Sequence, residues 1–228
     1  MRNNMAKKLS LRYVFRHYSP TLRARSAALK KFADKLGLVY FGSVDQHDDD
    51  YSPIRGFTAS ITHKDSHYLV GTYNDYDVRI VDRFDVIPLA GKSHEQLWTI
   101  FEVSLTNKNS PHVVFVPTGH EGGEYSRLFT TQTHLQPINT MALQNHSREI
   151  HGRFQIMAKT SDVPHVEQLL PSPTVVGIAA RFWPHGIELR DGKLYLYLTQ
   201  HRLEKAALET AIASLVWLAE VFDESLDT

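Results

Sequence analysis

Two stretches of the chain alternate polar and apolar residues on both sides of a short turn, which is the pattern of an antiparallel β-hairpin. The clearer hairpin spans residues 186–198 around Asp191-Gly192, a pair that supplies the positive φ angles a tight hairpin turn needs. The other spans residues 67–80 around an Asn-Asp pair. Local hairpins of this kind favour an antiparallel sheet.

Apolar residues at helical spacing predict helices near both ends of the chain. The first runs from Pro20 to Leu36, where proline suits the first helical position and Gly37 follows as a stop signal. A short helix begins at Asp162, and a long amphipathic helix from about Leu203 to Phe222 closes the chain.

The remaining apolar runs predict strands, at 38–41, 98–105, 112–116 and 154–158. Strands and helices do not alternate as βαβ units. We therefore expect an α+β fold: antiparallel sheet(s) with hairpins, with the N-terminal helix and the long C-terminal helix packed on one face. The length of 228 residues fits a single α+β domain over residues 19–228, preceded by a basic arm over residues 1–18.

The charges are divided unevenly along the chain. The whole sequence is formally neutral, but residues 1–36 contain ten Lys and Arg residues against Asp34 alone, a net charge of +9 that leaves −9 for the remainder. Such asymmetry indicates either an anionic partner for the basic end or its neutralisation by the acidic remainder of the same molecule or a neighbour. The candidate binding residues are Lys7, Lys8, Arg12, Arg16, Arg23 and Arg25.

Composition narrows the class of protein. The chain has no cysteine, which excludes disulfides, thiolate metal sites and a cysteine nucleophile. No apolar run approaches the length of a membrane span, and the basic N-terminus lacks the apolar core of a signal peptide. These features predict a cytoplasmic protein, either free or peripheral at the inner membrane face, where residues 1–18 form a crude basic amphipathic segment.

A family resemblance rests on the two hairpins and the closing helix. The segments 70–82 and 187–197 resemble an uncharacterised bacterial domain family of unknown function, in which a Gly-x-Tyr segment and a Val-x-Ile/Phe-Asp strand form one hairpin. Members of this family are often tethered to the membrane, whereas this sequence lacks a transmembrane helix. The resemblance implies no catalytic residues.

The segment from Thr118 to Tyr125 is the most site-like stretch of the chain. It follows a predicted buried strand, and His120, Glu121 and Glu124 have the chemistry for acid–base catalysis or metal ligation. The alternative, which we favour, is a flexible polar connection. His63 and His67 have the spacing of a helical metal pair, but the residues around them predict a turn. No metal or cofactor is predicted.

Other motifs support few functional classes. The sequence has no phosphate-binding glycine loop, dinucleotide fingerprint or nucleophile elbow. Tyr195 and Tyr197 share one face of a predicted strand and could stack on bases, but half-exposed tyrosines are ordinary in antiparallel sheets and there is no strong nucleic-acid signal.

Two hypotheses about function follow. The first is a non-enzymatic binding or accessory domain that docks on an anionic membrane surface or an acidic protein face through its basic N-terminal segment. The alternative is a small hydrolase or metal-dependent enzyme that uses the His120, Glu121 and Glu124 loop. Self-association into a homo-oligomer is compatible with both.

Overall fold

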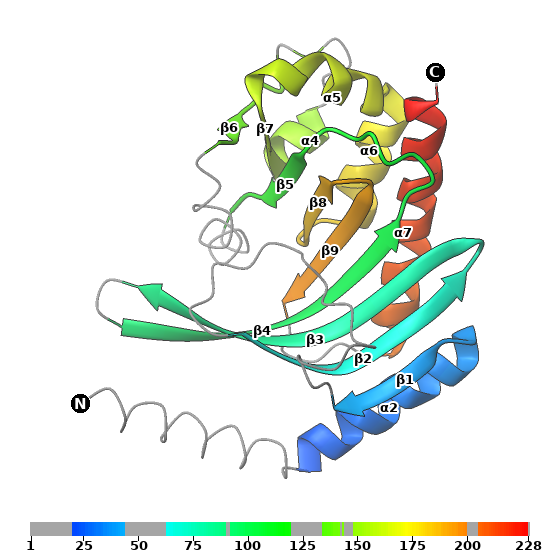
Figure 1. The fold of residues 1–228 in the computed structure, drawn as a ribbon. Coiled ribbons are helices and arrows are strands. Elements are labelled where there is room, and N and C mark those ends of the chain that lie inside the picture. The colour runs from blue at the N-terminus through cyan, green and yellow to red at the C-terminus, as the bar shows by residue number, and fades with distance from the viewer. Residues whose placement is uncertain are drawn as a thin grey trace.

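The computed structural model describes residues 20–43, 63–89, 92–119, 134–141, 143, 148–199 and 205–227. Within these ranges one antiparallel sheet contains nine strands in the order β1-β2-β3-β4-β9-β8-β5-β7-β6 (Figure 1). The strands are β1 (Val39–Ser43), β2 (His63–Tyr73), β3 (Tyr76–Leu89), β4 (Lys92–Ser104), β5 (Val113–Pro117), β6 (Gln136–Pro137), β7 (Phe154–Ala158), β8 (Gly186–Arg190) and β9 (Lys193–Thr199).

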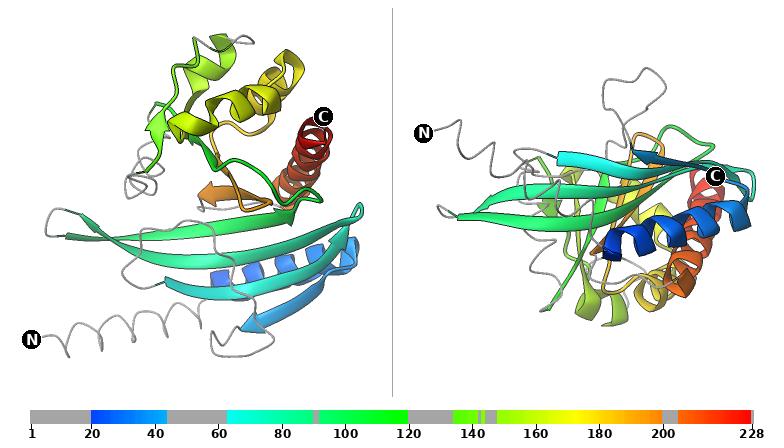
Figure 2. Two further views of the ribbon diagram at one scale, coloured as in Figure 1. Left: turned by 45° about the horizontal axis from the view of Figure 1, so that its top comes forward. Right: turned by 90° about the horizontal axis from the view of Figure 1, so that it is seen from below.

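Five α-helices and one short 3-10 helix lie in the described part of the chain: α2 (Pro20–Leu36), α4 (Arg148–Arg153), η1 (Thr160–Asp162), α5 (Val163–Leu169), α6 (Ser172–Arg181) and α7 (Lys205–Leu226). Figure 1 shows α2 along the β1 end of the sheet, with α4, α5 and α6 gathered at the other end. The right-hand view of Figure 2 shows α2 and α7 on the same side of the long strands.

The side of the sheet that α2 and α7 cover, which we call the helix face, carries an apolar core. Phe32 of α2, Phe101 of β4, Leu196 of β9 and Leu215 of α7 are all buried in one cluster there. Side chains alternate between the two faces of a strand, so Phe101 and Val103 of β4 and alternate leucines of β9 enter this core.

The alternate residues point to the opposite side, which we call the second face. Val81, Ile100 and Tyr197 belong to a separate buried cluster there. Acidic and basic side chains, such as Arg83 and Glu188, are buried on the same side. Buried charges are costly unless they are paired, so the partners of these side chains determine what this face can do.

The predicted arrangement of strands and helices within the fold class is wrong. We expected one or more antiparallel sheets with local hairpins, with the N-terminal helix and the long C-terminal helix packed on one face. The structure is α+β and has the C-terminal helix, but all its described strands join one large sheet. The hairpin of β8 and β9 lies between β4 and β5, and α4, α5 and α6 form additional helical cover.

Single elements were predicted with mixed success. The first helix has the predicted bounds, Pro20–Leu36, and the strand Phe154–Ala158 is also as predicted. The turn expected around His63 is wrong, because β2 begins at that residue. His67 instead has a positive φ of 55° at an irregularity in the pairing of β2 with β3.

Candidate functional site

Seven predicted site residues lie outside the part of the chain that the structure describes: His120, Glu121, Glu124, Lys7, Lys8, Arg12 and Arg16. The roles assigned to them stay predictions. The structure does describe the other two, Arg23 and Arg25, and both belong to α2.

Arg25 is engaged inside the molecule. Its guanidinium donates two hydrogen bonds of 2.9 Å to the carboxylate of Asp82 on β3 and one of 2.9 Å to the hydroxyl of Thr99 on β4. The side chains of Arg25 and Asp82 are only 13% and 8% exposed. Arg25 therefore attaches α2 to the sheet and is not free to bind a partner.

The basic residues on the outer side of α2 are placed differently. Arg23, Lys30 and Lys31 are exposed and have no ion pair among the described residues. Lys35, by contrast, pairs at 2.7 Å with Glu209 of α7. The pairs of Arg25 and Lys35 correspond to the intramolecular neutralisation that the charge asymmetry left open, whereas the three exposed residues remain available.

Four residues on the second face, from four neighbouring strands, lie opposite one another in a single cross-strand row. The register places Arg79 of β3 opposite Glu102 of β4, Glu102 opposite Tyr195 of β9, and Tyr195 opposite Glu188 of β8. Residues directly opposite each other have closely spaced Cβ atoms. Two buried carboxylates therefore flank one buried tyrosine.

Glu102, at 1% side-chain exposure, is held by two cations. Its Oε1 lies 3.2 Å from an Arg79 guanidinium nitrogen and 3.1 Å from the Lys193 ammonium. Its Oε2 is buried and accepts no hydrogen bond from a described residue. Burial raises the pKa of the neighbouring Tyr195 hydroxyl, and the negative charges of Glu102 and Glu188 raise it further, so Tyr195 stays protonated and cannot serve as a base.

Glu188 is the centre of a hydrogen-bonded chain of side chains. Its carboxylate, fully buried, accepts a 2.5 Å bond from the Tyr197 hydroxyl and lies 2.9 Å from Nε2 of His112. Nδ1 of His112 is 3.2 Å from Nε2 of the exposed His134. Partial desolvation of its ring lowers the pKa of His134, and the neighbouring His112 lowers it further.

This series of hydrogen-bonded side chains runs from the surface to the interior, but among the described residues it includes no serine or cysteine nucleophile. A serine or cysteine within reach of His112 would be needed for acyl transfer, and the described contacts of His112 are Glu188 and His134. The arrangement links the residue before β5 to side chains of β8 and β9. Tyr195 and Tyr197 are 3% and 0% exposed, so the sequence-based picture of half-exposed or base-stacking tyrosines is wrong.

A second buried ion pair lies farther along the same face. The Arg83 guanidinium donates hydrogen bonds of 2.7 and 2.8 Å to the two carboxylate oxygens of Asp65. Both side chains are at most 2% exposed. This fork geometry is the strongest form of a carboxylate–arginine contact.

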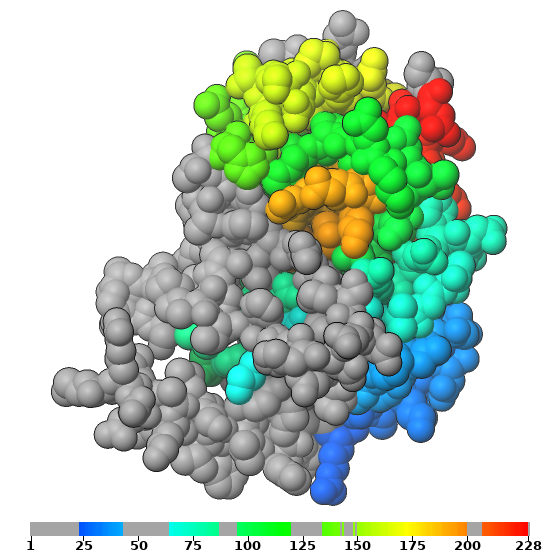
Figure 3. All heavy atoms as spheres, viewed as in Figure 1, coloured from blue at the N-terminus to red at the C-terminus, as the bar shows by residue number. Residues whose placement is uncertain are grey.

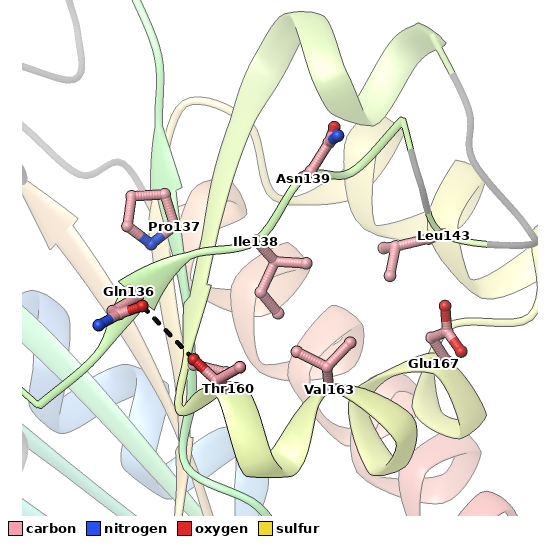
Figure 4. Close-up of a pocket in the computed structure, with 9 residues that line it drawn as sticks. Gln136, Pro137, Ile138, Asn139, Leu143, Thr160, Val163 and Glu167 are labelled. Carbon is pink, nitrogen blue, oxygen red and sulfur yellow. Dashed lines mark hydrogen bonds between the residues drawn. The ribbon is translucent and has the colours of Figure 1, made fainter.

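Three cavities are lined by described residues. The one in Figure 4, of about 340 Å³, lies between the β6 region and α5. Ile138, Leu143 and Val163 line it, together with Gln136 and Thr160, whose side chains are hydrogen-bonded to each other. A more polar cavity of about 450 Å³ has His112, Lys159, Asp162 and His165 in its wall.

The third cavity, of about 290 Å³, contains His185 between β9 and α7. Burial lowers the pKa of His185 to about 4, and its Nδ1 has no hydrogen-bond partner among the described residues. In the described ranges, no three His, Asp or Glu side chains are grouped closely enough to hold a metal ion. No helix of those ranges is both long and apolar enough to cross a membrane.

No protein-family model and no curated protein sequence matches the chain. Among solved structures, the chain is similar to the mycobacterial trehalose monomycolate transport factor A, TtfA, with a TM-score of 0.52 and 9% sequence identity. The similarity covers 88% of this chain and 93% of the transport factor. At this identity the likeness shows a shared fold.

The sequence-based resemblance to a bacterial family is supported only in its coarse form. The structural neighbour is a bacterial protein, but without a matching family model the particular family is not shown.

Sequence reasoning missed Glu102 and the pair of Glu188 with His112. Glu102 and Glu188 stand between apolar neighbours in their strands, and His112 directly precedes the apolar strand β5. A polar residue in such a place is a local signal of a buried polar group that needs a partner. The identity of the partner depends on the sheet order, and no local pattern contains it.

Proposed function

We propose that this protein is a non-enzymatic accessory protein that docks on an anionic partner through its basic N-terminal region. The observation that carries the proposal is the contrast among its charged groups. On the second face the buried carboxylates of Asp65, Glu102 and Glu188 are held in ion pairs or hydrogen-bonded chains, whereas Arg23, Lys30 and Lys31 of α2 are exposed and unpaired in the described ranges.

The structural neighbour supports the accessory part of the proposal. Its name describes a transport factor, and a shared fold makes a similar auxiliary role the natural hypothesis for this chain, by analogy of fold alone. The proposed organisation is the basic arm over residues 1–18 and one domain over residues 19–228. Its proposed place is the cytoplasm or the inner membrane face.

The test compares the full chain with a variant in which Lys7, Lys8, Arg12 and Arg16 are changed to Gln. Binding is measured to phosphatidylserine vesicles, to an acidic peptide and to single-stranded DNA. We expect binding to at least one anionic probe that weakens with salt and weakens again in the variant, because exposed charges are screened. Neutral phosphatidylcholine vesicles are the control, and absence of salt-sensitive binding by the intact chain would overturn the proposal.

A further inference from the structure

Strand β1 is an edge of the sheet. The strand order begins with β1, which pairs with β2 and with no other strand of the described ranges. Its other edge therefore presents backbone N–H and C=O groups to which no described strand is paired. Natural proteins commonly protect such an edge with charged residues or proline, and Val39–Ser43, with the sequence Val-Tyr-Phe-Gly-Ser, has neither.

Two side chains of β1 on the second face, those of Val39 and Phe41, are apolar and exposed. Val39 is 56% exposed and Phe41 is 46% exposed. Phe41 lies against Tyr68 of β2, with ring centroids 6.0 Å apart. An extended segment that paired with β1 could therefore contact the apolar side chains of Val39 and Phe41 on the second face.

The intervening residue, Tyr40, points to the helix face, where its hydroxyl is 2.8 Å from that of Ser26 on α2. Arg23 and Lys30 lie three residues before and four after Ser26, so the three share one side of the helix. We call Arg23 and Lys30 the cationic flank. Lys35 on the other side of α2 reaches Glu209 of α7, so the cationic flank faces the β1 edge. Figure 3 shows α2 and β1, in blue, together at one side of the molecule.

We propose that β1 pairs with an extended acidic segment of a partner protein, which adds one strand to the sheet. Its alternate side chains would contact Val39 and Phe41 on the second face and the cationic flank on the helix face. Arg23 and Lys30 are about 10 Å apart along α2, from a rise of about 1.5 Å per residue, and same-face residues of a strand are about 7 Å apart. Two or three alternating acidic residues would therefore match the flank.

This inference rests on the proposed function, because it specifies the anionic partner. Strand addition supplies affinity through main-chain hydrogen bonds and specificity through alternate side chains. A second copy of the chain is the less favourable occupant. Antiparallel pairing of two β1 edges would bring two cationic flanks together, and like charges across an interface oppose association.

The probe is a short fluorescent peptide that alternates Glu and Val, titrated into the full chain. We expect binding that weakens with salt and slower hydrogen exchange at the amides of Val39–Ser43 in the complex. Two control peptides replace Glu by Lys, or place Pro in the middle to remove a main-chain donor. Lack of binding by the Glu–Val peptide, or equal binding by either control peptide, overturns the proposal.

Variants locate the site. Phe41→Lys, and Arg23→Glu with Lys30→Glu, should each weaken peptide binding by about tenfold or more, a change of about 1.4 kcal/mol for each factor of ten. The controls are Val176→Lys, at another exposed apolar residue (48% exposed), and Arg148→Glu with Lys159→Glu, which changes the net charge equally. The controls should bind like the original chain, and equal loss in them contradicts the proposed site.

Further measurements separate this inference from the proposed function. If phosphatidylserine vesicles bind the full chain, lose affinity in the Arg23→Glu and Lys30→Glu variant and keep it in Phe41→Lys, while the peptide does not bind, strand addition is wrong and anionic docking stands. If the intact chain has the mass of a dimer in solution and Phe41→Lys has that of a monomer, the occupant of β1 is a second copy and the inference is overturned.

Discussion

The two faces of the sheet bury their residues by different means. On the helix face, apolar side chains such as Phe32 and Phe101 pack against α7 in one cluster. On the second face, buried aromatic residues surround charged groups that are held in pairs, such as Arg83 with Asp65. Removal of apolar area from water stabilises the first arrangement, whereas the second depends on partners that come from different strands.

This difference implies different sensitivities. An apolar core tolerates substitutions that keep its volume, whereas substitutions that leave a cavity lower its stability. A buried ion pair responds strongly to the loss of one partner, yet its replacement as a whole by apolar residues is often neutral. Substitutions on the two faces should therefore differ in whether a second change can restore stability.

The largest effect is expected on the helix face. Phe32→Ala removes a fully buried ring from α2 and should lower the free energy of unfolding by about 4 kcal/mol, because of lost burial and the cavity that remains. Urea denaturation measures it. Phe32→Leu, which leaves a smaller cavity, should cost clearly less, and equal losses for both would contradict the cavity explanation.

On the second face, Arg79→Met together with Lys193→Met should cost about 3–4 kcal/mol. The substitutions leave the carboxylate of Glu102 buried without the two cations that contact it. Adding Glu102→Leu to this variant should recover most of the loss, measured by the same denaturation. If the triple variant does not regain stability, the side chains of this row stabilise the fold by more than the pairing of their charges.

The control for that variant is Arg190→Met. Arg190 pairs with Asp191, whose side chain is 82% exposed, and exposed ion pairs contribute little. We expect a change below about 0.5 kcal/mol.

The third prediction concerns His185, whose Nδ1 has no hydrogen-bond partner among the described residues. Burial lowers the pKa of His185 to about 4 from an ordinary value of 6.5. Between pH 6.5 and 4 the unfolded chain therefore binds more protons at this residue than the folded chain. The contribution of neutral His185 to the free energy of unfolding is fully present above pH 6.5 and is lost as the pH falls from 6.5 towards 4. The shift corresponds to roughly 3 kcal/mol.

Comparing the original chain with His185→Gln by urea denaturation between pH 7 and 4 tests this expectation. The variant should lose less stability over that pH range, since one contribution to its pH dependence is removed. His165→Gln, at an exposed histidine of α5, is the matched control. Identical pH profiles for the original chain and His185→Gln would show that His185 accepts its proton without cost.

Local elements could be predicted because their signals lie in adjacent residues. Pro20 and Gly37 bracket α2, and Gly37 has the positive φ of 72° expected after a helix. Both hairpin turns also have positive φ angles, at Asn74-Asp75 and at Asp191-Gly192. In each case a short stretch of sequence determines the backbone.

The sheet order could not be predicted in the same way. The hairpin of β8 and β9 follows α5 and α6 in the chain, yet it pairs with β4 on one side and β5 on the other. That choice depends on long-range packing. Because it brings Glu102, Tyr195 and Glu188 together, the polar row was also beyond the reach of sequence patterns.

The smallest expected effect compares the two ion pairs of α2. Arg25 and Asp82 are mostly buried and share several hydrogen bonds, whereas the side chains of Lys35 and Glu209 are 53% and 30% exposed. Lys35→Ala should change the free energy of unfolding by at most about 0.5 kcal/mol. Arg25→Ala should cost several times more, because it leaves the buried carboxylate of Asp82 without this arginine. Denaturation of both variants at low and high salt is the measurement, and only the Lys35 contribution should vanish at high salt. Equal effects of the two substitutions would mean that burial does not distinguish the basic residues of α2. They would contradict the assignment of a structural role to Arg25 and of a binding role to the cationic flank.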